Sequence, residues 1–368
     1  MCIRKDTEAE SMKYNMPTKV YSEPDCIAHH AEEIAAFGSH ALIVTGRCSA
    51  KKNGALDDMT AALQNKGQQF TLFDEIEENP SVETVMKARD TGLRCGADFV
   101  IGIGGGSPMD AAKAIAMMIN RPYSDWDALY TAGGSPALPV IAVPTTCGTG
   151  SEVTGVSVLT RHDLKTKVSI KHKIFPSLAL IDGRYICNTP HKIIVNTAID
   201  ALSHLIESCV NTQSDCFSEM SSYAGLRLWG ECRPYIEGSA PIDPEAAQKL
   251  MNASALAGMS IAQTGTAIPH ALSYMLTYHA GIPHGAAVGA FQANYLEFAE
   301  YSLREKILQA AGFRDTNELR SFIQNLAPVQ VDRALLESSA DSVLQNPEKL
   351  RLCPYPIDKD IMLKLIEI

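Results

Sequence analysis

Three consecutive glycines at residues 104–106 constrain the fold most, because they separate an apolar run from a helix-like run in FVIGIGGGSPMDAAKAIA. Residues 99–103 predict a buried strand, and the glycines predict a turn without Cβ atoms. Ser107 and Asp110 are spaced to cap the next helix, with Pro108 in its first turn. A strand, glycine turn and helix in this order expose backbone N–H groups that bind phosphate. The third glycine of G-x-G-x-x-G is replaced by Ser107, and a turn that only packs a helix closely on a sheet is the alternative.

The first half of the chain alternates strand-like and helix-like segments. Predicted strands cover residues 41–45, 70–73, 99–103, 140–143 and 178–181, and predicted helices cover residues 54–64, 81–95 and the segment after Ser107. A hairpin is expected from residues 153–159 and 167–170 around RHDLKT, and helical periodicity continues after residue 190. We therefore predict an α/β dinucleotide-binding domain with a Rossmann-like parallel sheet at residues 1–185. An all-α metal-binding domain is predicted at residues 186–368, with the reaction in the cleft between the two.

Bulk properties predict a soluble enzyme. The 368 residues suffice for two domains, and the net charge of −10 disfavours binding to nucleic acid or to anionic membranes. No apolar run reaches transmembrane length, and the start, MCIRKDTEAE, is charged where a signal peptide would be apolar. The ten cysteines contain no C-x-x-C and no pairing pattern, as expected in a reducing compartment. We expect a cytoplasmic protein.

A second loop with the character of a ligand-binding loop follows the strand predicted at residues 140–143. In VPTTCGTGSEVT, Thr145, Thr146 and Thr149 supply hydroxyls, and two glycines let the backbone approach a ligand. Open α/β sheets bind ligands at the carboxyl ends of their strands, so this loop is expected to face the cleft. A threonine-rich connection without a ligand is the alternative.

Four potential metal ligands lie in the helical half. Asp200 and His204 are four residues apart in AIDALSH, on one face of a predicted helix. His270 lies in a second helix-like run, and His284 follows a Gly-Ile-Pro turn that could fold back toward it, with His279 as a rival ligand. Three imidazoles and one carboxylate favour Fe²⁺ or Zn²⁺ over Mg²⁺ or Ca²⁺. Alone, the Asp–His pair also fits a surface carboxylate near a core histidine. Together with the phosphate-binding pattern, it indicates a nucleotide cofactor working beside a metal ion.

Four motifs in this order resemble the iron-containing (group III) alcohol dehydrogenases. They are GGGSPMDAAKA, PTTCGTGSEVT, AIDALSHLIE and the segment that runs from His270 to IPHG. The similarity extends from about Pro17 to His284. It implies a dehydroquinate synthase-like architecture and an NAD(P)-dependent alcohol dehydrogenase or aldehyde reductase with one divalent ion. A homodimer is expected, because members of this family are commonly homo-oligomeric.

The resemblance also implies roles for individual residues. It makes Asp200, His204, His270 and His284 the metal ligands, and it prefers His284 to His279 because the family's last ligand lies in a Pro-His-Gly unit. The cofactor-binding residues that it implies are Asn79, Gly105, Gly106, Ser107, Asp110, Thr145, Thr146, Thr149, Val158 and Lys167.

One departure from the family concerns proton transfer. Many members have a histidine one helical turn after the third ligand, and here that position is Tyr274. A tyrosine hydroxyl titrates near pH ~10 and is a poorer relay at neutral pH. Either the proton passes through water or the cofactor ribose, or His279 substitutes from the loop. Tyr274 and His279 are therefore the candidate catalytic residues, although Tyr274 could simply line the pocket.

A second departure concerns the choice of cofactor. Members that use NAD often carry an aspartate directly after the first strand, where it repels the 2′-phosphate of NADP. Here the strand is followed by GRCSAKKNG, which begins at Gly46. Gly46 leaves room, and Arg47, Ser49 and the nearby lysines can meet a phosphate. NADP(H) is therefore predicted in preference to NAD(H), and a solvated basic turn is the alternative.

The expected reaction is hydride transfer between nicotinamide C4 and a small aldehyde or primary alcohol or diol. Glycerol-type polyols are alternative substrates, as are anionic aldehydes with a sulfonate or phosphonate held by Lys171, His172 or Lys173. A dehydroquinate-synthase-like lyase is disfavoured because few Arg and Lys surround the predicted ligands. A non-catalytic binding protein is disfavoured because no ligand is missing.

Overall fold

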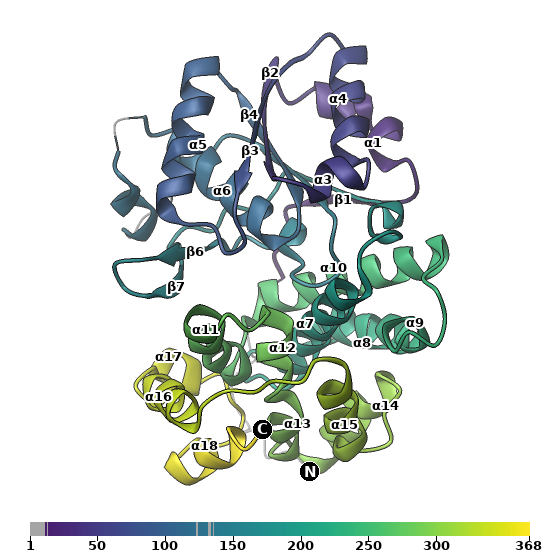
Figure 1. The fold of residues 1–368 in the computed structure, drawn as a ribbon, viewed down its shortest axis with the longest axis vertical. Helices are drawn as coiled ribbons and strands as arrows, with labels where there is room; N and C mark the ends of the chain where they lie inside the picture. The colour runs from purple at the N-terminus through teal and green to yellow at the C-terminus, as the bar shows by residue number, and fades with distance from the viewer. Residues whose placement is uncertain (1–11, 13, 123, 132–133, 135) are drawn as a thin grey trace.

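The first half of the molecule is a six-stranded parallel sheet between helices (Figure 1). The structure is a computed structural model that describes residues 12, 14–122, 124–131, 134 and 136–368. In spatial order, the strands are β1 (Lys19–Ser22), β8 (Leu178–Ile181), β5 (Val140–Pro144), β4 (Phe99–Gly104), β2 (His40–Gly46) and β3 (Gln69–Ile76). This confirms the predicted parallel α/β architecture. β1 was not predicted, because this edge strand pairs only with β8 and has no fully buried residue.

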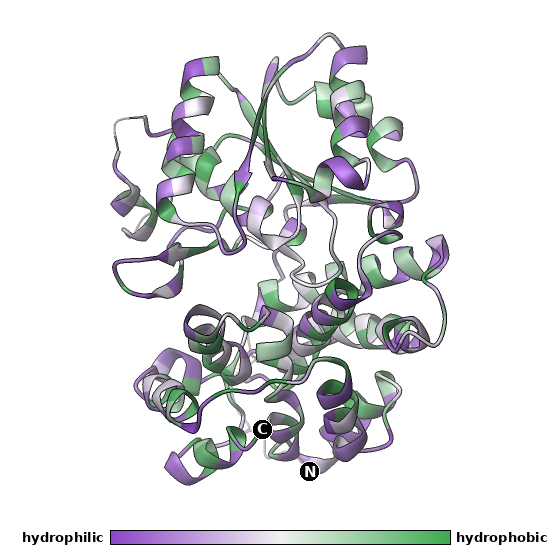
Figure 2. Cartoon of the chain, viewed as in Figure 1, coloured by the Kyte–Doolittle hydropathy of each residue, from purple (hydrophilic) through white to green (hydrophobic). Residues whose placement is uncertain are grey.

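Alternate residues of the central strands pack against helices on opposite faces of the sheet. Ala41 and Ile43 of β2 face a layer of short helices, and Leu42 and Val44 face the other layer. The first layer contains α1 (Cys26–His29), α2 (Ala31–Ala35), α3 (Ser49–Lys52) and α4 (Ala55–Asn65), and the second contains α5 (Val82–Cys95) and α6 (Gly106–Ile119). Coverage on both faces explains why these strands are almost continuously apolar (Figure 2).

The predicted hairpin is present, but its first strand is shorter than expected. β6 (Val158–Arg161) pairs antiparallel with β7 (Thr166–Ser169). Gly150 turns the chain with a left-handed φ of 59°, and Val153, where the predicted strand began, instead ends the 3-10 helix η2 (Ser151–Val153). The hairpin lies below the sheet in Figure 1, where β7 packs against α11 (Ile268–Ala280).

The prediction that Ser107 and Asp110 cap the helix after the glycine turn was wrong. α6 begins at Gly106, with Gly105 as its N-cap. The Ser107 hydroxyl instead accepts a hydrogen bond of 3.1 Å from the Asn79 N–H. The Asp110 carboxylate accepts bonds from other segments, as described below. Because glycine has no side chain to cap the helix, the N–H groups of the first turn stay free for a ligand.

The second half of the molecule is built only of helices from residue 188 to the end. Its longer helices are α7 (His191–Cys209), α8 (Cys216–Glu231), α10 (Pro244–Thr264), α11, α14 (Tyr301–Ala310), α15 (Thr316–Leu326) and α16 (Arg333–Leu344). The shorter helices are α9 (Arg233–Ile236), α12 (His284–Gly289), α13 (Gln292–Glu297), α17 (Pro347–Leu350) and α18 (Lys359–Leu365). Two 3-10 helices, η1 (Trp126–Tyr130) and η3 (Gly183–Ile186), belong to the first half of the chain. Among the described residues, no helix is long and apolar enough to span a bilayer.

The two halves meet where the loop after β5 reaches α7 and α10. A Cβ atom on Gly148 would lie 2.8 Å from the Thr197 carbonyl oxygen of α7, and Gly150 packs directly on Gly258 of α10. Only glycine allows this approach of backbone to backbone. The contact places the carboxyl ends of β4 and β5 opposite the helix that carries Asp200 and His204.

Candidate metal and cofactor site

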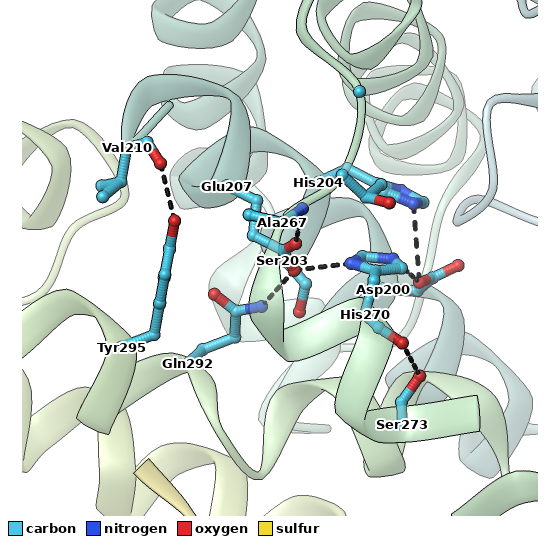
Figure 3. A network of polar contacts seen from close by, with 12 residues as sticks. Asp200, Ser203, His204, Glu207, Val210, Ala267, His270, Ser273, Gln292 and Tyr295 are labelled. Carbon is cyan, nitrogen blue, oxygen red and sulfur yellow. Dashed lines mark hydrogen bonds and ion pairs between the residues drawn. The ribbon is translucent and has the colours of Figure 1, made fainter. Parts of the chain in front are cut away.

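Four side chains from three helices converge beneath the sheet. Asp200 and His204 come from α7, His270 from α11, and His284 from the first turn of α12. The Nε2 atoms of His204, His270 and His284 lie 4.0, 3.5 and 3.7 Å from one carboxylate oxygen, Oδ1 of Asp200. Figure 3 shows the His204 and His270 rings turned toward Asp200. The structure therefore brings together all four residues predicted as ligands.

The second ring nitrogen of each imidazole has a partner that fixes the ring. Nδ1 of His270 donates to Glu207 at 2.5 Å, Nδ1 of His204 lies 3.3 Å from the Gly148 carbonyl oxygen, and Nδ1 of His284 lies 3.5 Å from the Ser273 hydroxyl. These contacts leave each Nε2 facing Asp200, which is the orientation that metal ligands require.

Glu207 is a functional candidate that the sequence analysis missed. It is fully buried, and it also accepts hydrogen bonds from the Ala267 N–H at 2.6 Å and from Gln292 at 2.8 Å (Figure 3). The signal was present in the sequence, because Glu207 lies three residues after His204 on the same face of an apolar helix. An acid at such a position predicts a buried partner for a ligand.

Burial and charge set the protonation of the four side chains. Burial alone would raise the pKa of Asp200, but the imidazoles of His204, His284 and His270 around it bring it below its usual range. Burial lowers the pKa of His204 and takes that of His284 well below its usual value. Burial would also lower the pKa of His270, but Glu207 and Asp200 raise it to about 9. An ionised carboxylate and two neutral imidazoles are ready to bind a metal ion, and His270 would release its proton on binding.

The hydrogen bonding of these residues also fits a divalent ion. Oδ1 of Asp200 and Nε2 of His270 are buried and have no hydrogen-bond partner among the described residues. Buried polar atoms are nearly always paired, so two orphaned atoms that face each other indicate a missing shared partner. Ligand atoms of Asp200, His270 and His284 all lie within 4.8 Å of one another, which is close enough for one ion.

The glycine turn and the threonine loop face each other at the carboxyl ends of β4 and β5. A Cβ atom on Gly105 would lie 3.1 Å from Oγ1 of Thr146, and one on Gly106 would lie 2.7 Å from Cγ2 of Thr149. Thr145 is buried, and its N–H donates to the Gly104 carbonyl oxygen at 2.8 Å. After β2, the chain adds β3 on one side of this strand and then crosses to add β4 on its other side. Such a switch point between β2 and β4 is where open α/β sheets bind nucleotides.

Asn79 links several of the predicted cofactor residues. It has a left-handed φ of 57°, donates its N–H to Ser107, and accepts at Oδ1 from Nζ of Lys167 at 3.3 Å. Lys167 is buried, and burial lowers the pKa of its ammonium group to about 8. The structure therefore brings Asn79, Ser107 and Lys167 together in front of the glycine turn.

Asp110 and Val158 lie at the back of this arrangement. One carboxylate oxygen of Asp110 accepts from the Ser151 hydroxyl at 2.5 Å, and the other accepts from the Val158 N–H at 2.8 Å. The fully buried Lys113 adds bonds of 2.7 Å to the Ser151 hydroxyl and to the Val156 carbonyl oxygen. Asp110 thus braces the segment after the threonine loop against α6.

The two candidate catalytic residues lie in different places. Tyr274 stacks on His284 with ring centroids 6.3 Å apart, and Nζ of Lys167 lies 5.4 Å from the Tyr274 ring centre. Burial raises the pKa of Tyr274 to about 12. His279 is exposed in the last turn of α11, where its ring contacts Tyr278, and the structure does not bring it to the Asp200 cluster. Only Tyr274 therefore lies beside the predicted ligands.

The turn predicted to select the cofactor follows β2 on the other side of the switch point. Arg47 and Ser49 are exposed, and a Cβ atom on Gly46 would meet the Ile76 carbonyl oxygen at 3.4 Å. Lys51 forms an ion pair with Asp74 of β3, and this hydrogen bond lowers the pKa of Asp74. The sequence of the turn contains no acid, but the fold brings one beside it.

A parallel sheet with a glycine-lined cradle, opposite a carboxylate–histidine cluster, defines a nucleotide-dependent metalloenzyme. Comparisons with known proteins agree. Residues 17–183 match the family model described as iron-containing alcohol dehydrogenase, and residues 194–364 match the one described as Fe-containing alcohol dehydrogenase family, C-terminal.

Individual relatives are similar over most of the chain. The crystal structure of an iron-containing alcohol dehydrogenase from Thermotoga maritima is 33% identical, with a TM-score of 0.88, and the match covers 96% of this chain and 98% of that one. The NADPH-dependent butanol dehydrogenase of Clostridium saccharobutylicum is 28% identical over 82% of this chain and 77% of its own length. The sulfoacetaldehyde reductase of Bifidobacterium kashiwanohense, solved with NAD⁺, is 27% identical with a TM-score of 0.84 over 96% of each chain.

The chain belongs to the iron-containing alcohol dehydrogenase family. It is a metal-dependent alcohol dehydrogenase or aldehyde reductase that works with a nicotinamide cofactor.

Proposed function

We propose that the protein interconverts small aldehydes and primary alcohols or diols with NADP(H), at one divalent ion held by Asp200, His204, His270 and His284. The observation that carries this proposal is the convergence of three imidazole Nε2 atoms on one buried, unpaired carboxylate oxygen. When bound, Fe²⁺ or Zn²⁺ supplies Lewis-acid polarisation of the substrate oxygen. Glu207 holds the His270 ring so that its Nε2 stays directed at Asp200.

The cofactor is held by backbone and small side chains in this proposal. The free N–H groups at Gly105, Gly106 and Ser107 bind the pyrophosphate, and Thr146 and Thr149 close the cradle from the opposite loop. Asn79 and Lys167 lie between this cradle and Tyr274, where they suit the ribose next to the nicotinamide. The chain thus orients the hydride donor and excludes water from it.

The proton leaves without Tyr274 or His279 in this proposal. The pKa of Tyr274 is about 12, so its hydroxyl keeps its proton at neutral pH, and His279 is exposed away from the cluster. Lys167 lies beside Tyr274, and its ammonium group, whose pKa of about 8 lies closer to neutral pH, would stand next to the route of the proton to water. A bound cofactor would supply a ribose hydroxyl on this route.

The NADP(H) preference rests on Gly46, Arg47 and Ser49. The ion pair with Asp74 engages Lys51, but Arg47 and Ser49 stay exposed and can meet a 2′-phosphate. The free thiols of the described cysteines support a cytoplasmic location, and a homodimer stays a prediction.

An anionic aldehyde is a second candidate substrate, although the cavity that Lys173 lines also contains Asp215 and none of the predicted metal or cofactor residues. The cavity has a volume of about 550 Å³, and Phe175, Ala262 and Gln263 also line it. Of the other residues predicted to bind an anion, His172 is buried and bonded to the Ala128 carbonyl oxygen, and Lys171 is exposed. The similarity to a sulfoacetaldehyde reductase favours testing this class.

The test combines metal content with turnover. Wild type, His284→Ala and His279→Ala are stripped of metal, loaded with Fe²⁺ or Zn²⁺, and assayed with alcohols, diols and sulfoacetaldehyde and both cofactors. We expect His284→Ala to lose the ion and the activity while it stays folded, and His279→Ala to keep the ion and most of the rate. Loss of the ion only in His279→Ala would contradict the ligand assignment, and phosphate release without NADP⁺ reduction would favour a lyase.

A further inference from the structure

A second cluster of metal-binding side chains lies at the edge of the sheet, in the segment SEPDCIAHH. Glu23, Cys26 and His30 each present a ligand atom, and these atoms lie within 4.8 Å of one another. We propose that Glu23, Cys26 and His30 form a second divalent-metal site that takes zinc. None of the three takes part in the catalytic site described above.

The backbone brings these side chains together at a sharp turn between β1 and α1. Asp25 precedes α1 with a left-handed φ of 56°, and its carboxylate pairs with Arg184 at 2.7 Å. Cys26 and His30 are four residues apart, and the His30 N–H donates to the Cys26 carbonyl oxygen, so both side chains lie on one side of the turn. The rings of Tyr21 and His30 stack with an interplanar angle of 13°, which fixes the orientation of the imidazole.

The donor atoms have the chemistry of a zinc site and lie close together. Nε2 of His30 lies 2.8 Å from Oε1 of Glu23, and the Cys26 sulfur lies within 4.8 Å of both atoms and 3.6 Å from the Tyr21 carbonyl oxygen. One sulfur, one imidazole and one carboxylate suit zinc, which binds such atoms at about 2.0–2.3 Å. Small movements would bring all three within that reach.

The neighbouring His29 offers a fourth ligand. Its Nδ1 lies 3.4 Å from the same Glu23 oxygen, and the ring is exposed and free to turn. Burial raises the pKa of the Cys26 thiol to about 12, so zinc would displace the thiol proton, which passes to the buffer. A Glu23–His30 ion pair alone is the competing interpretation, and it gives the thiol no role.

Cobalt distinguishes the two sites, because only this cluster contains a sulfur ligand. Full-length protein is stripped of metal, reloaded with Co²⁺ or Zn²⁺, and examined by metal analysis and absorption spectroscopy. We expect two equivalents of metal in wild type and a near-ultraviolet sulfur-to-cobalt charge-transfer band. His204→Ala should lose one equivalent and turnover but keep the band.

Variants of the cluster should give the opposite result. Cys26→Ser and His30→Gln should each lose one equivalent and the charge-transfer band, while alcohol oxidation with the remaining ion is unchanged. His30→Gln keeps the test decisive if the buried Cys26→Ser variant does not fold, and Cys95→Ser serves as the matched thiol control. A single equivalent in wild type without the band, or a band that survives in both cluster variants, would overturn the proposal.

Discussion

The two halves of the molecule hold their ligands by opposite means. In the α/β half, Gly105 and Gly106 at the start of α6 offer backbone N–H groups and no side chain. In the helical half, Asp200 and Glu207 are buried carboxylates, and pairing with imidazoles helps to stabilise their charges there. The first region selects a ligand by shape and the second by charge. Substitutions should therefore weaken cofactor binding in one half and metal binding in the other.

Among the residues that hold the predicted metal ligands in place, Glu207→Gln is expected to lower the metal affinity most. The amide can still accept from Nδ1 of His270 at 2.5 Å, but it removes the buried negative charge that makes this imidazole a strong ligand. Partners of metal ligands are worth about 10–100-fold in metal affinity, and complete burial favours a value near 100-fold. Titration of the stripped enzyme with Fe²⁺ or Zn²⁺ measures the change. Exposed Glu219→Gln on α8 is the control, and an affinity equal to wild type in Glu207→Gln would contradict the role of Glu207.

The sequence predicted which four side chains converge, but it did not predict the residues that support them. Strands and the glycine turn follow from local apolar runs and from the absence of Cβ atoms, and the Asp200–His204 pair follows from helical spacing. Partners distant in sequence are set by packing between helices, so the contact of Gln292 with Glu207, 85 residues earlier, could not be predicted. The capping prediction failed for a related reason, because Asp110 bonds instead to Val158, 48 residues away.

The turn after β2 allows a test of shape against charge within the α/β half. Gly46→Asp places a negative charge beside the proposed 2′-phosphate site and should shift the NADPH-to-NADH ratio of kcat/KM toward NADH. A charge-assisted bond is worth about 2 kcal/mol, so the ratio should change about 30-fold. Metal content should not change. A wild type that prefers NADH would contradict the proposed preference, and an unchanged ratio in the variant would assign selectivity to another group, such as Asp74.

Gly106→Ala tests whether the cradle works by shape. The new Cβ atom would lie 2.7 Å from Cγ2 of Thr149, so the threonine loop must shift. Overpacking costs about 1–3 kcal/mol, and we expect roughly tenfold weaker NADPH binding by fluorescence titration, with normal metal content. Gly134→Ala is the control, since a Cβ atom there meets nothing within 4 Å. Metal loss in Gly106→Ala would show that the two halves are coupled. It would contradict the expectation that substitutions in the α/β half weaken cofactor binding alone.

The smallest effect on kcat/KM is expected for Tyr274→Phe. Tyr274 lies where the two halves meet. Its ring contacts His284 on one side and Lys167 on the other, and phenylalanine preserves both ring contacts. Because the pKa of Tyr274 is about 12, its hydroxyl stays protonated between pH 6 and 9 and cannot exchange a proton with the substrate at a useful rate. If Tyr274 relayed a proton, Tyr274→Phe would lower kcat/KM by about 100-fold or more. If it only lines the pocket, the variant should change kcat/KM by less than about threefold. The pH profile of kcat/KM separates the two roles, since a pocket residue leaves its shape unchanged and a relay removes one of its limbs.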